Sequence, residues 1–276
     1  MRILEGLILG LIQGITEFLP ISSSGHLVIA QTMFGISENN LAFDILLHAA
    51  TFFAIVAAYS QTVIGMIREF FLMLRDVFTR KGAGLKENKY RRYIFYIIIG
   101  CIPAGVAGVL LDDLVDSLFL KLPVVGLMLL LTGFVLCLAE KLGEHTAGEL
   151  GDLGVAKSFV VGLFQMCAIM PGLSRSGTTM TGGVVMGLKK EDALEFSFLL
   201  ALPTIAGSVV LKIGDIAQAI RTISIFPCLV GFFAALVSGY LSIILFKKIV
   251  QKGGLMGFSV YCWALGLIVL LGMGRI

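Results

Sequence analysis

The stretch GLIQGITEFLPISSSGHL, residues 10–27, begins like a membrane span and is then interrupted by polar residues. Gln13 and Glu17 lie four residues apart in its apolar first half, so on a helix they share one face. Pro20, three serines and His26 follow. Ionisable residues inside an apolar segment are costly, so this pattern indicates a functional site within the membrane.

The composition of the whole chain supports a membrane protein. Of its 276 residues, 58% are hydrophobic and 14% are charged, whereas a soluble domain has about 25% charged residues. Long apolar runs predict helices, because a transmembrane barrel shows short segments of alternating polarity. We therefore expect an all-α polytopic membrane protein with one integral domain over residues 1–276. The net charge of +3 gives no indication of a nucleic-acid partner.

Six segments are apolar enough to span a bilayer, which requires about 20 residues. They are, roughly, 41–64, 91–111, 122–139, 193–213, 223–246 and 255–273. Two further segments, roughly 3–36 and 157–188, are interrupted by PISSSGH and PGLSRSG. Non-helical backbone at membrane depth persists only where it is buried in protein or lines a wet cavity. The sequence thus predicts about six transmembrane helices plus two re-entrant helical hairpins.

The charges of the loops predict the orientation of these segments. Residues 65–92 are rich in lysine and arginine and should be cytoplasmic, whereas DDLVD at 112–116 should lie outside. The lysines at 189–190 and 247–252 fall inside only if residues 157–188 return to the side they left. With this assignment the first hairpin enters the membrane from outside and the second enters from inside.

The two hairpins also resemble each other. GLIQ at 10–13 and SSSG at 22–25 are matched by GLFQ at 162–165 and SRSG at 174–177, with an offset of 152 residues in both cases. A segment that begins with phenylalanine follows each hairpin, FDILLHAAT in the first and FSFLLALPT in the second. Such a pattern is typical of inverted-topology repeats, whose broken helices meet near the midplane and form the site there. We expect the repeat halves to be roughly 1–120 and 121–276.

Arg175 is the strongest functional signal in the second hairpin. It lies between apolar runs and is flanked by Ser174, Ser176 and Thr179. A guanidinium matches phosphate oxygens in a planar fork, and hydroxyls with free amides at a helix N-terminus complete an anion site. We therefore expect phosphate binding here, the alternative being a structural ion pair with Glu17 or another acid.

Glu17 and His26 are the ionisable residues of the first hairpin. Glu17 is either neutral, paired with Arg175, a ligand of a divalent cation, or a base. His26 can act as base, acid or nucleophile in phosphoryl transfer, or only hydrogen-bond to backbone. Ser22 and Ser23, in the serine run, offer a nucleophile, hydrogen-bond donors or helix caps. Gln13 can orient a ligand, but as an amide it cannot transfer a proton.

Two ionisable residues lie on the segments that follow the hairpins. His48 and Glu195 can either support a site built by the hairpins or have a purely structural role. The glycines of the apolar segments can pack helices within one chain or between the chains of a homodimer.

At this point the chain resembles a known family, the bacterial undecaprenyl-diphosphate phosphatases, or bacitracin-resistance proteins. The resemblance covers nearly the whole chain. It is carried by the Glu/Gln-x-x-x-Glu motif, met by Gln13 and Glu17, and by Pro-Gly-x-Ser-Arg-Ser-x-x-Thr, met by Pro171 through Thr179. EFSFLLALP at 195–203 also resembles a family segment.

The resemblance implies hydrolysis of undecaprenyl diphosphate in the bacterial inner membrane. This phosphatase reaction recycles the lipid carrier of cell-wall and peptidoglycan synthesis, supports cell shape, and gives resistance to the antibiotic bacitracin. The resemblance implies that the catalytic residues are Glu17, Ser23, His26 and Arg175. It implies that the substrate is bound by Gln13, Ser22, Ser174, Ser176 and Thr179. The family also implies a divalent cation, Mg²⁺ or Ca²⁺, with Glu17 as its ligand. Gln13 stands where some members have glutamate, which weakens a site built on two carboxylates.

A transporter or lipid flippase is the alternative from another class of protein. Inverted repeats with broken helices occur in secondary carriers, where a charged pair near the midplane can bind substrate during alternating access. A purely structural scaffold would leave two costly polar hairpins unexplained.

Overall fold

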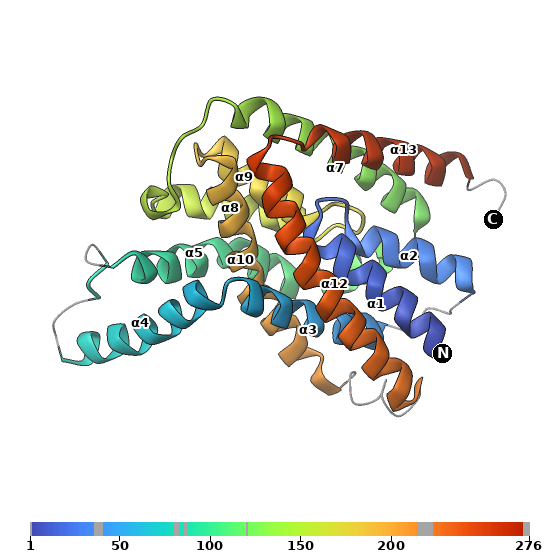
Figure 1. Ribbon diagram of the computed structural model, residues 1–276, viewed down its shortest axis with the longest axis horizontal. Helices are drawn as coiled ribbons and strands as arrows, with labels where there is room; N and C mark the ends of the chain where they lie inside the picture. Colours follow the sequence, from blue (N-terminus) through green and yellow to red (C-terminus); the bar gives the residue numbers. More distant parts are fainter. Residues whose placement is uncertain are drawn as a thin grey trace.

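The computed structural model describes residues 2–35, 41–79, 83–85, 88–119, 121–214 and 223–272. These residues form helices joined by short connections (Figure 1). The helices are α1 Ile3–Phe18, α2 Ser23–Phe34, α3 Leu41–Ala58, α4 Ser60–Phe78, α5 Lys89–Leu110, α6 Asp112–Phe119, α7 Leu122–Gly143, α8 Val155–Cys167, α9 Arg175–Val185, α10 Lys190–Leu211, α12 Ile225–Gln251 and α13 Met256–Gly272, with a 3₁₀ turn, η1, at Leu150–Asp152. The predicted all-α class is confirmed.

Within the described residues, four helices are long and apolar enough to cross a membrane. They are α5, α7, α10 and α12, with 22 to 27 residues each. They correspond to the predicted spans 91–111, 122–139, 193–213 and 223–246. The chain is therefore a multi-pass membrane protein.

Of the other two expected spans, one is bent and one is short. Instead of one helix over 41–64, α3 ends at Ala58 and α4 begins at Ser60, with a bend of 91° between them. α4 carries Arg68 and Arg75, and charged side chains are excluded from the hydrocarbon interior unless they are paired there. The expected span 255–273 is α13, whose described part has 17 residues, the short end of the range of about 17–25 that crosses a bilayer.

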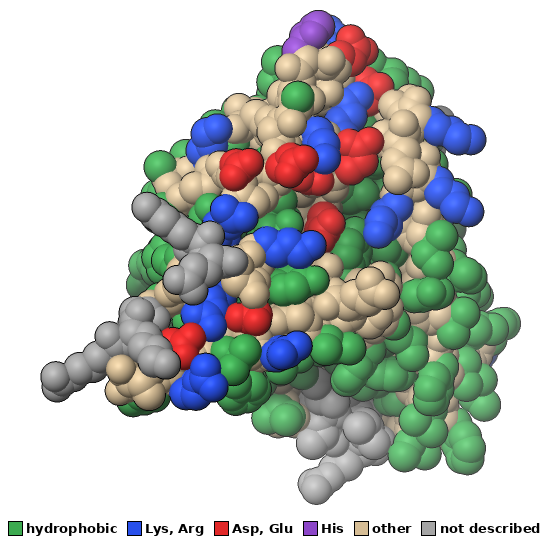
Figure 2. Space-filling view, turned by 60° about the vertical axis from the view of Figure 1, so that its left-hand side comes forward, with side chains coloured by type: hydrophobic (Ala, Val, Ile, Leu, Met, Phe, Trp, Pro, Cys, Tyr) green, Lys and Arg blue, Asp and Glu red, His purple; other side chains and the backbone are tan. Residues whose placement is uncertain are grey.

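Charged side chains gather at one end of the molecule. Figure 2 shows lysine, arginine, aspartate and glutamate on the face that holds the start of α5 and the connection from α7 to α8, whereas hydrophobic side chains cover much of the rest of this view. Arg91 of α5 binds Glu69 at 2.9 Å and Asp76 at 2.8 Å, which ties α5 to α4. Several residues used to predict sidedness, namely Arg80, Lys81, Lys86, loop residues 215–222 and the side chains of Asp112, Asp113 and Asp116, lie outside the described residues.

Glycines bring the first half-helix into close contact with a spanning helix. A side chain at Gly6 of α1 would lie 2.6 Å from the carbonyl oxygen of Pro227, and one at Gly14 would lie 2.5 Å from that of Ala235. α1 therefore runs alongside α12 in the same direction, packed backbone to backbone (Figure 1). α12 ends in basic residues, so this direction is from outside to inside.

The second half-helix is held in the same way by a different span. α8 lies along α5, and a side chain at Gly162 would come within 2.9 Å of Pro103 and also meet the carbonyl oxygen of Gly100. α5 begins with Lys89 at the basic end, so α8 enters from inside. The two half-helices thus enter from opposite faces. The division into halves 1–120 and 121–276 stays a prediction.

An aromatic cluster fixes the end of α1 at the centre of the molecule. The ring of Phe18 meets that of Phe198 edge to face at 5.4 Å, and Phe198 in turn contacts Phe246 at 6.5 Å. Phe18, Phe198 and Phe246 are fully or almost fully buried. Burying aromatic rings stabilises this junction of α1, α10 and α12 and places the neighbouring Glu17 at the middle of the fold.

Candidate active site

The loops of the two broken helices meet inside the molecule. The amide of Gly172, in the second loop, donates to the hydroxyl of Ser24 in the first at 3.3 Å. Thr132 of α7 holds the second loop from the other side, because its hydroxyl accepts from Ser174 N at 3.0 Å and donates to Gly172 O at 3.1 Å. Gly172 has φ of 95°, which favours glycine. The two polar interruptions therefore form one structural unit.

Each loop ends in a serine that caps the next half-helix. Ser22 Oγ accepts from Gly25 N at 3.2 Å, and Ser174 Oγ accepts from Gly177 N at 3.2 Å. The N-termini of α2 and α9 both begin at this unit. Helix N-termini carry partial positive charge and favour an anion.

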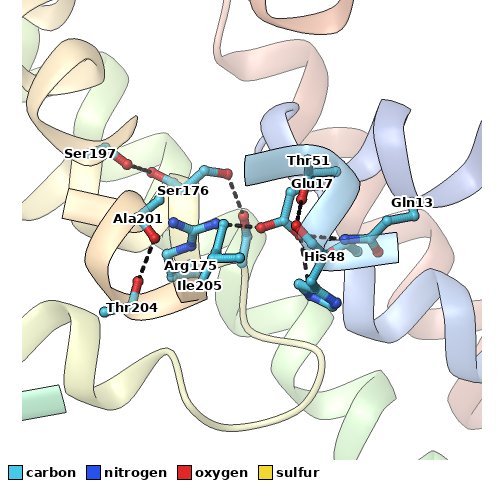
Figure 3. A network of polar contacts seen from close by, with 12 residues as sticks. Gln13, Glu17, His48, Thr51, Arg175, Ser176, Ser197, Ala201, Thr204 and Ile205 are labelled. Atoms are coloured by element: carbon cyan, nitrogen blue, oxygen red, sulfur yellow. Dashed lines mark hydrogen bonds and ion pairs between the residues drawn. The ribbon is translucent and has the colours of Figure 1, made fainter. Parts of the chain in front are cut away.

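Residues from the two hairpins form an ion pair at the centre. Arg175 Nη2 of α9 donates to Glu17 Oε1 of α1, and Figure 3 shows the two side chains pointing toward one another. The second carboxylate oxygen, Oε2, accepts from Ser23 Oγ at 2.6 Å and from Gln13 Nε2 at 3.1 Å. The side chain of Glu17 is only 5% exposed, and such a buried carboxylate requires these partners.

A cavity of about 730 Å³ opens beside this cluster. Its polar end is formed by Glu17, Ser22, Ser23, Ser24, His48, Gln165, Ser174 and Arg175. Its other end is mostly apolar and reaches the last turns of α5 and α10, where Val109 and Leu211 line it. A ligand with a charged head and an apolar tail matches this division.

The imidazole of His26 contacts Ser22 and Tyr261 and does not line the cavity. Its Nδ1 contacts the carbonyl of Ser22 at 2.7 Å, its Nε2 contacts the hydroxyl of Tyr261 at 2.7 Å, and its ring stacks on that tyrosine. The ring thus folds back toward α13, and His26 is not among the residues that line the cavity. The imidazole beside the carboxylate is that of His48 on α3, with Nε2 3.6 Å from Glu17 Oε2.

Comparison with known proteins shows the family of the chain. The family described as "Bacitracin resistance protein BacA" matches residues 6–268 of this chain. The chain belongs to the BacA family. An undecaprenyl-diphosphatase of Methanobrevibacter smithii is 42% identical over 274 residues, covering 99% of this chain and 98% of the relative. Undecaprenyl-diphosphatases of Alkaliphilus metalliredigens and Bacillus thuringiensis are 37% and 39% identical, each covering 98% of this chain and 98% and 97% of the relative.

Three of the predicted substrate-binding residues of this BacA chain lie behind the cavity wall. Gln13, Ser176 and Thr179 are buried and do not line the cavity. Thr179 Oγ1 donates to the carbonyl of Arg175 at 2.8 Å, and Ser197 of α10 donates to the carbonyl of Ser176 at 3.2 Å (Figure 3). These contacts hold the first turn of α9 and therefore the backbone of Arg175. Ser22 and Ser174 line the cavity as well as capping their helices.

Several buried polar atoms near the BacA site lack a hydrogen-bond partner among the described residues. They include Nη1 of Arg175 and Oγ1 of Thr178. Gln165 on α8 is 3% exposed, lines the cavity, and has both amide atoms unpaired apart from the thiol of Cys101 beside it, which is a weak partner. Unpaired buried polar groups cost about 1–3 kcal/mol each, so these atoms require partners from a bound ligand or from ordered water. In the sequence repeat Gln165 corresponds to Gln13, but no role was predicted for Gln165.

The part of the chain that the structure describes does not form a protein-held metal site. Among the described residues there is no group of three or more histidine, cysteine, aspartate or glutamate side chains that could hold a metal ion. The two oxygens of Glu17 are occupied by Arg175, Ser23 and Gln13. The donor set therefore does not fit the cation that was expected at Glu17.

Proposed function

We propose that this chain hydrolyses undecaprenyl diphosphate to undecaprenyl phosphate and inorganic phosphate. The supporting observation is a buried carboxylate, guanidinium and serine at the polar end of an otherwise apolar cavity inside a membrane protein. Membership of the BacA family, with relatives named undecaprenyl-diphosphatase, supports the same substrate. The reaction recycles the lipid carrier of cell-wall synthesis and lowers the amount of diphosphate that bacitracin can bind.

Arg175 binds the diphosphate in this proposal. One of its terminal nitrogens is held by Glu17 and the other, Nη1, has no partner in the described residues, so it is available for a phosphate oxygen. The N-termini of α2 and α9 add partial positive charge on either side. Phosphoryl transfer depends mainly on such positioning and charge stabilisation.

Ser23 supplies the attacking oxygen, and Glu17 takes its proton. Ser23 Oγ donates to Glu17 Oε2, so the carboxylate takes the hydroxyl proton as Oγ bonds to the terminal phosphorus. The bridging P–O bond breaks, and its electron pair leaves with undecaprenyl phosphate. Water then displaces Oγ from phosphorus and releases inorganic phosphate. Direct attack by water, oriented by the same pair, gives the same products, and trapping phosphate on Ser23 distinguishes the two routes.

The apolar end of the cavity accepts the lipid. A side chain at Gly105, Gly108 or Gly207 would meet no atom within 4 Å, so this end has open space for an isoprenoid chain. It lies at the ends of α5 and α10 that are opposite the basic loops. By the positive-inside rule this is the extracytoplasmic side, and we place the protein in the bacterial inner membrane with its site facing outward.

A divalent cation enters this proposal only with the substrate. Because the donor set does not fit a protein-held ion, we propose that Mg²⁺ or Ca²⁺, where the reaction requires one, arrives bound to the diphosphate. The half-saturating cation concentration should then follow the lipid concentration. A Glu17→Gln variant that loses tight cation binding in the absence of lipid would contradict this.

Release of phosphate by the purified protein in detergent tests the function. We expect release from undecaprenyl diphosphate by the wild type, and loss of release in Arg175→Ala and Glu17→Ala variants that remain folded and monodisperse. No release by the folded wild type, together with movement of the lipid between leaflets in vesicles, would instead favour a transporter or flippase.

A further inference from the structure

One of the three histidines faces the candidate active site. His26 is bonded to Ser22 and Tyr261, and His145 is exposed near the end of α7. His48, on the helix that follows the first hairpin, lines the cavity with its side chain 30% exposed. His48 is not among the residues predicted to be catalytic, and the sequence left its role open between supporting the site and a purely structural one.

The backbone of α3 determines which nitrogen of His48 carries a proton. Nδ1 lies 2.8 Å from the carbonyl oxygen of Asp44, which can only accept, so Nδ1 must donate. In the neutral ring Nε2 therefore carries no proton. Nε2 is directed at Glu17 Oε2 from 3.6 Å, as Figure 3 shows. That spacing is too long for a direct hydrogen bond and is closed by a small side-chain shift or one water molecule.

The proposed reaction leaves a proton on Glu17 that a second group must accept. Once Glu17 takes the proton of the attacking oxygen it is neutral, and the guanidinium of Arg175, whose side chain is 20% exposed, loses its partner. A charge that is largely removed from water and has no partner is unfavourable. Transfer of the proton from Glu17 Oε2 to His48 Nε2 restores the carboxylate and leaves the positive charge on an imidazolium that reaches the cavity.

We propose that His48, rather than His26, is the imidazole of this site and accepts the proton from Glu17. The proposal rests on the proposed phosphatase function. No atom is gained or lost in the step: the O–H bond of the protonated carboxyl breaks, an N–H bond forms at Nε2, and the proton later passes to solvent or to the phosphate product.

The charged and titratable groups around His48 are compatible with this role. Those that contact His48 or line the same cavity are Glu17 on α1, Asp44 on α3, Cys101 on α5, Arg175 on α9 and, at the other end of the cavity, Lys212 after α10. The carboxylate of Asp44 is engaged by Gln31 Nε2 at 2.8 Å, and only its backbone carbonyl meets the ring. Glu17 is therefore the group with which Nε2 can exchange a proton.

Substitution of each histidine, followed by chemical rescue, tests the proposal. Phosphate release from undecaprenyl diphosphate is measured in detergent for His48→Ala, His48→Gln, His26→Ala and His145→Ala, with and without added imidazole. We expect His48→Ala to lose about 100-fold in kcat, the usual scale of a lost proton acceptor, with KM little changed. Imidazole should restore part of this rate in a saturable manner. His145→Ala, altered on the surface, should behave as wild type.

The glutamine variant separates proton transfer from structure. His48→Gln keeps a side chain that can hydrogen-bond to Glu17 but cannot take up a proton, so it should stay as slow as His48→Ala. Full activity of His48→Gln, or rescue by imidazole in His26→Ala but not in His48→Ala, overturns the proposal. If the wild type itself releases no phosphate, the proposed function fails instead.

Discussion

The two broken helices use the same cap but place different chemistry beside it. In both loops the cap serine accepts from the glycine amide three residues on, and lies 3.3 Å from the hydroxyl two residues on. The residue between those two hydroxyls is Ser23 in the first loop and Arg175 in the second. Both of these side chains donate to Glu17. The shared residues thus build the scaffold, and the position that differs between the copies carries the function.

The copies also differ in backbone strain. Ser174 has φ of −65°, an ordinary value, whereas Ser22 has φ of 70°, which is rare for a residue with a side chain. In the second loop the positive φ falls on Gly172 instead. Strained backbone at a site is retained when it aims a group that matters, and here Ser22 directly precedes Ser23.

The largest expected effect comes from removing either charge. Arg175→Ala and Glu17→Ala should each lower kcat/KM at least about 10³-fold, because the guanidinium binds the phosphate and the carboxylate takes the proton. Since the two act as one unit, the double variant should be no slower than the worse single variant. Kinetics of phosphate release in detergent measure this. Losses that multiply in the double variant would show that the two residues act independently.

The next effect separates the serines of the first loop. Ser23→Ala should lower kcat by about 100-fold or more, because it removes the hydroxyl bonded to Glu17. Ser24→Ala should lower it by less than about tenfold, because Ser24 Oγ makes only neutral hydrogen bonds, with Ser22 Oγ and with the amide of Gly172. Both variants are measured with the same lipid. Equal losses would contradict the assignment of Ser23.

A smaller effect concerns stability and tests the backbone difference. Ser22→Gly loses the cap but relieves the positive φ, so it should be more stable than Ser22→Ala by about 1–2 kcal/mol. At Ser174, where φ is ordinary, the glycine and alanine variants should differ by less than this. Thermal unfolding in detergent, followed by the fluorescence of Trp263, the single tryptophan, compares the four variants. A difference at Ser174 as large as that at Ser22 would argue against strain.

Sequence patterns were sufficient for the architecture near the site. The interrupted segments, the opposite entry of the half-helices and the meeting of Glu17 with Arg175 follow from hydropathy, loop charge and the repeat. The bend between α3 and α4 was not predicted, because no proline or glycine marks it and only three polar residues, Ser60–Thr62, separate the apolar residues before it from those after it. Windowed hydropathy does not detect such a change of direction.

The orientation of individual side chains could not be read from the sequence. His26 follows the serine run, but the carbonyl of Ser22 and the hydroxyl of Tyr261, 235 residues away, turn its ring from the cavity. His48 reaches Glu17 only because α3 packs against α1 and α12, a contact that no local pattern contains. Its spacing from Asp44, one helical turn, was the available signal.

The smallest expected effect compares the two glutamines. Gln13 Nε2 donates to Glu17, whereas Gln165, its counterpart on α8, finds at most the thiol of Cys101 in the described residues. Gln13→Leu should therefore lower stability, and Gln165→Leu should leave it unchanged or raise it by about 1 kcal/mol, because a buried polar group without a partner is replaced by an apolar one. If Gln165 binds the substrate, its replacement should also raise KM several-fold without changing kcat. A Gln165→Leu protein that unfolds as readily as Gln13→Leu would show that the amide is bound within the protein, and that the unpaired atoms do not mark a ligand.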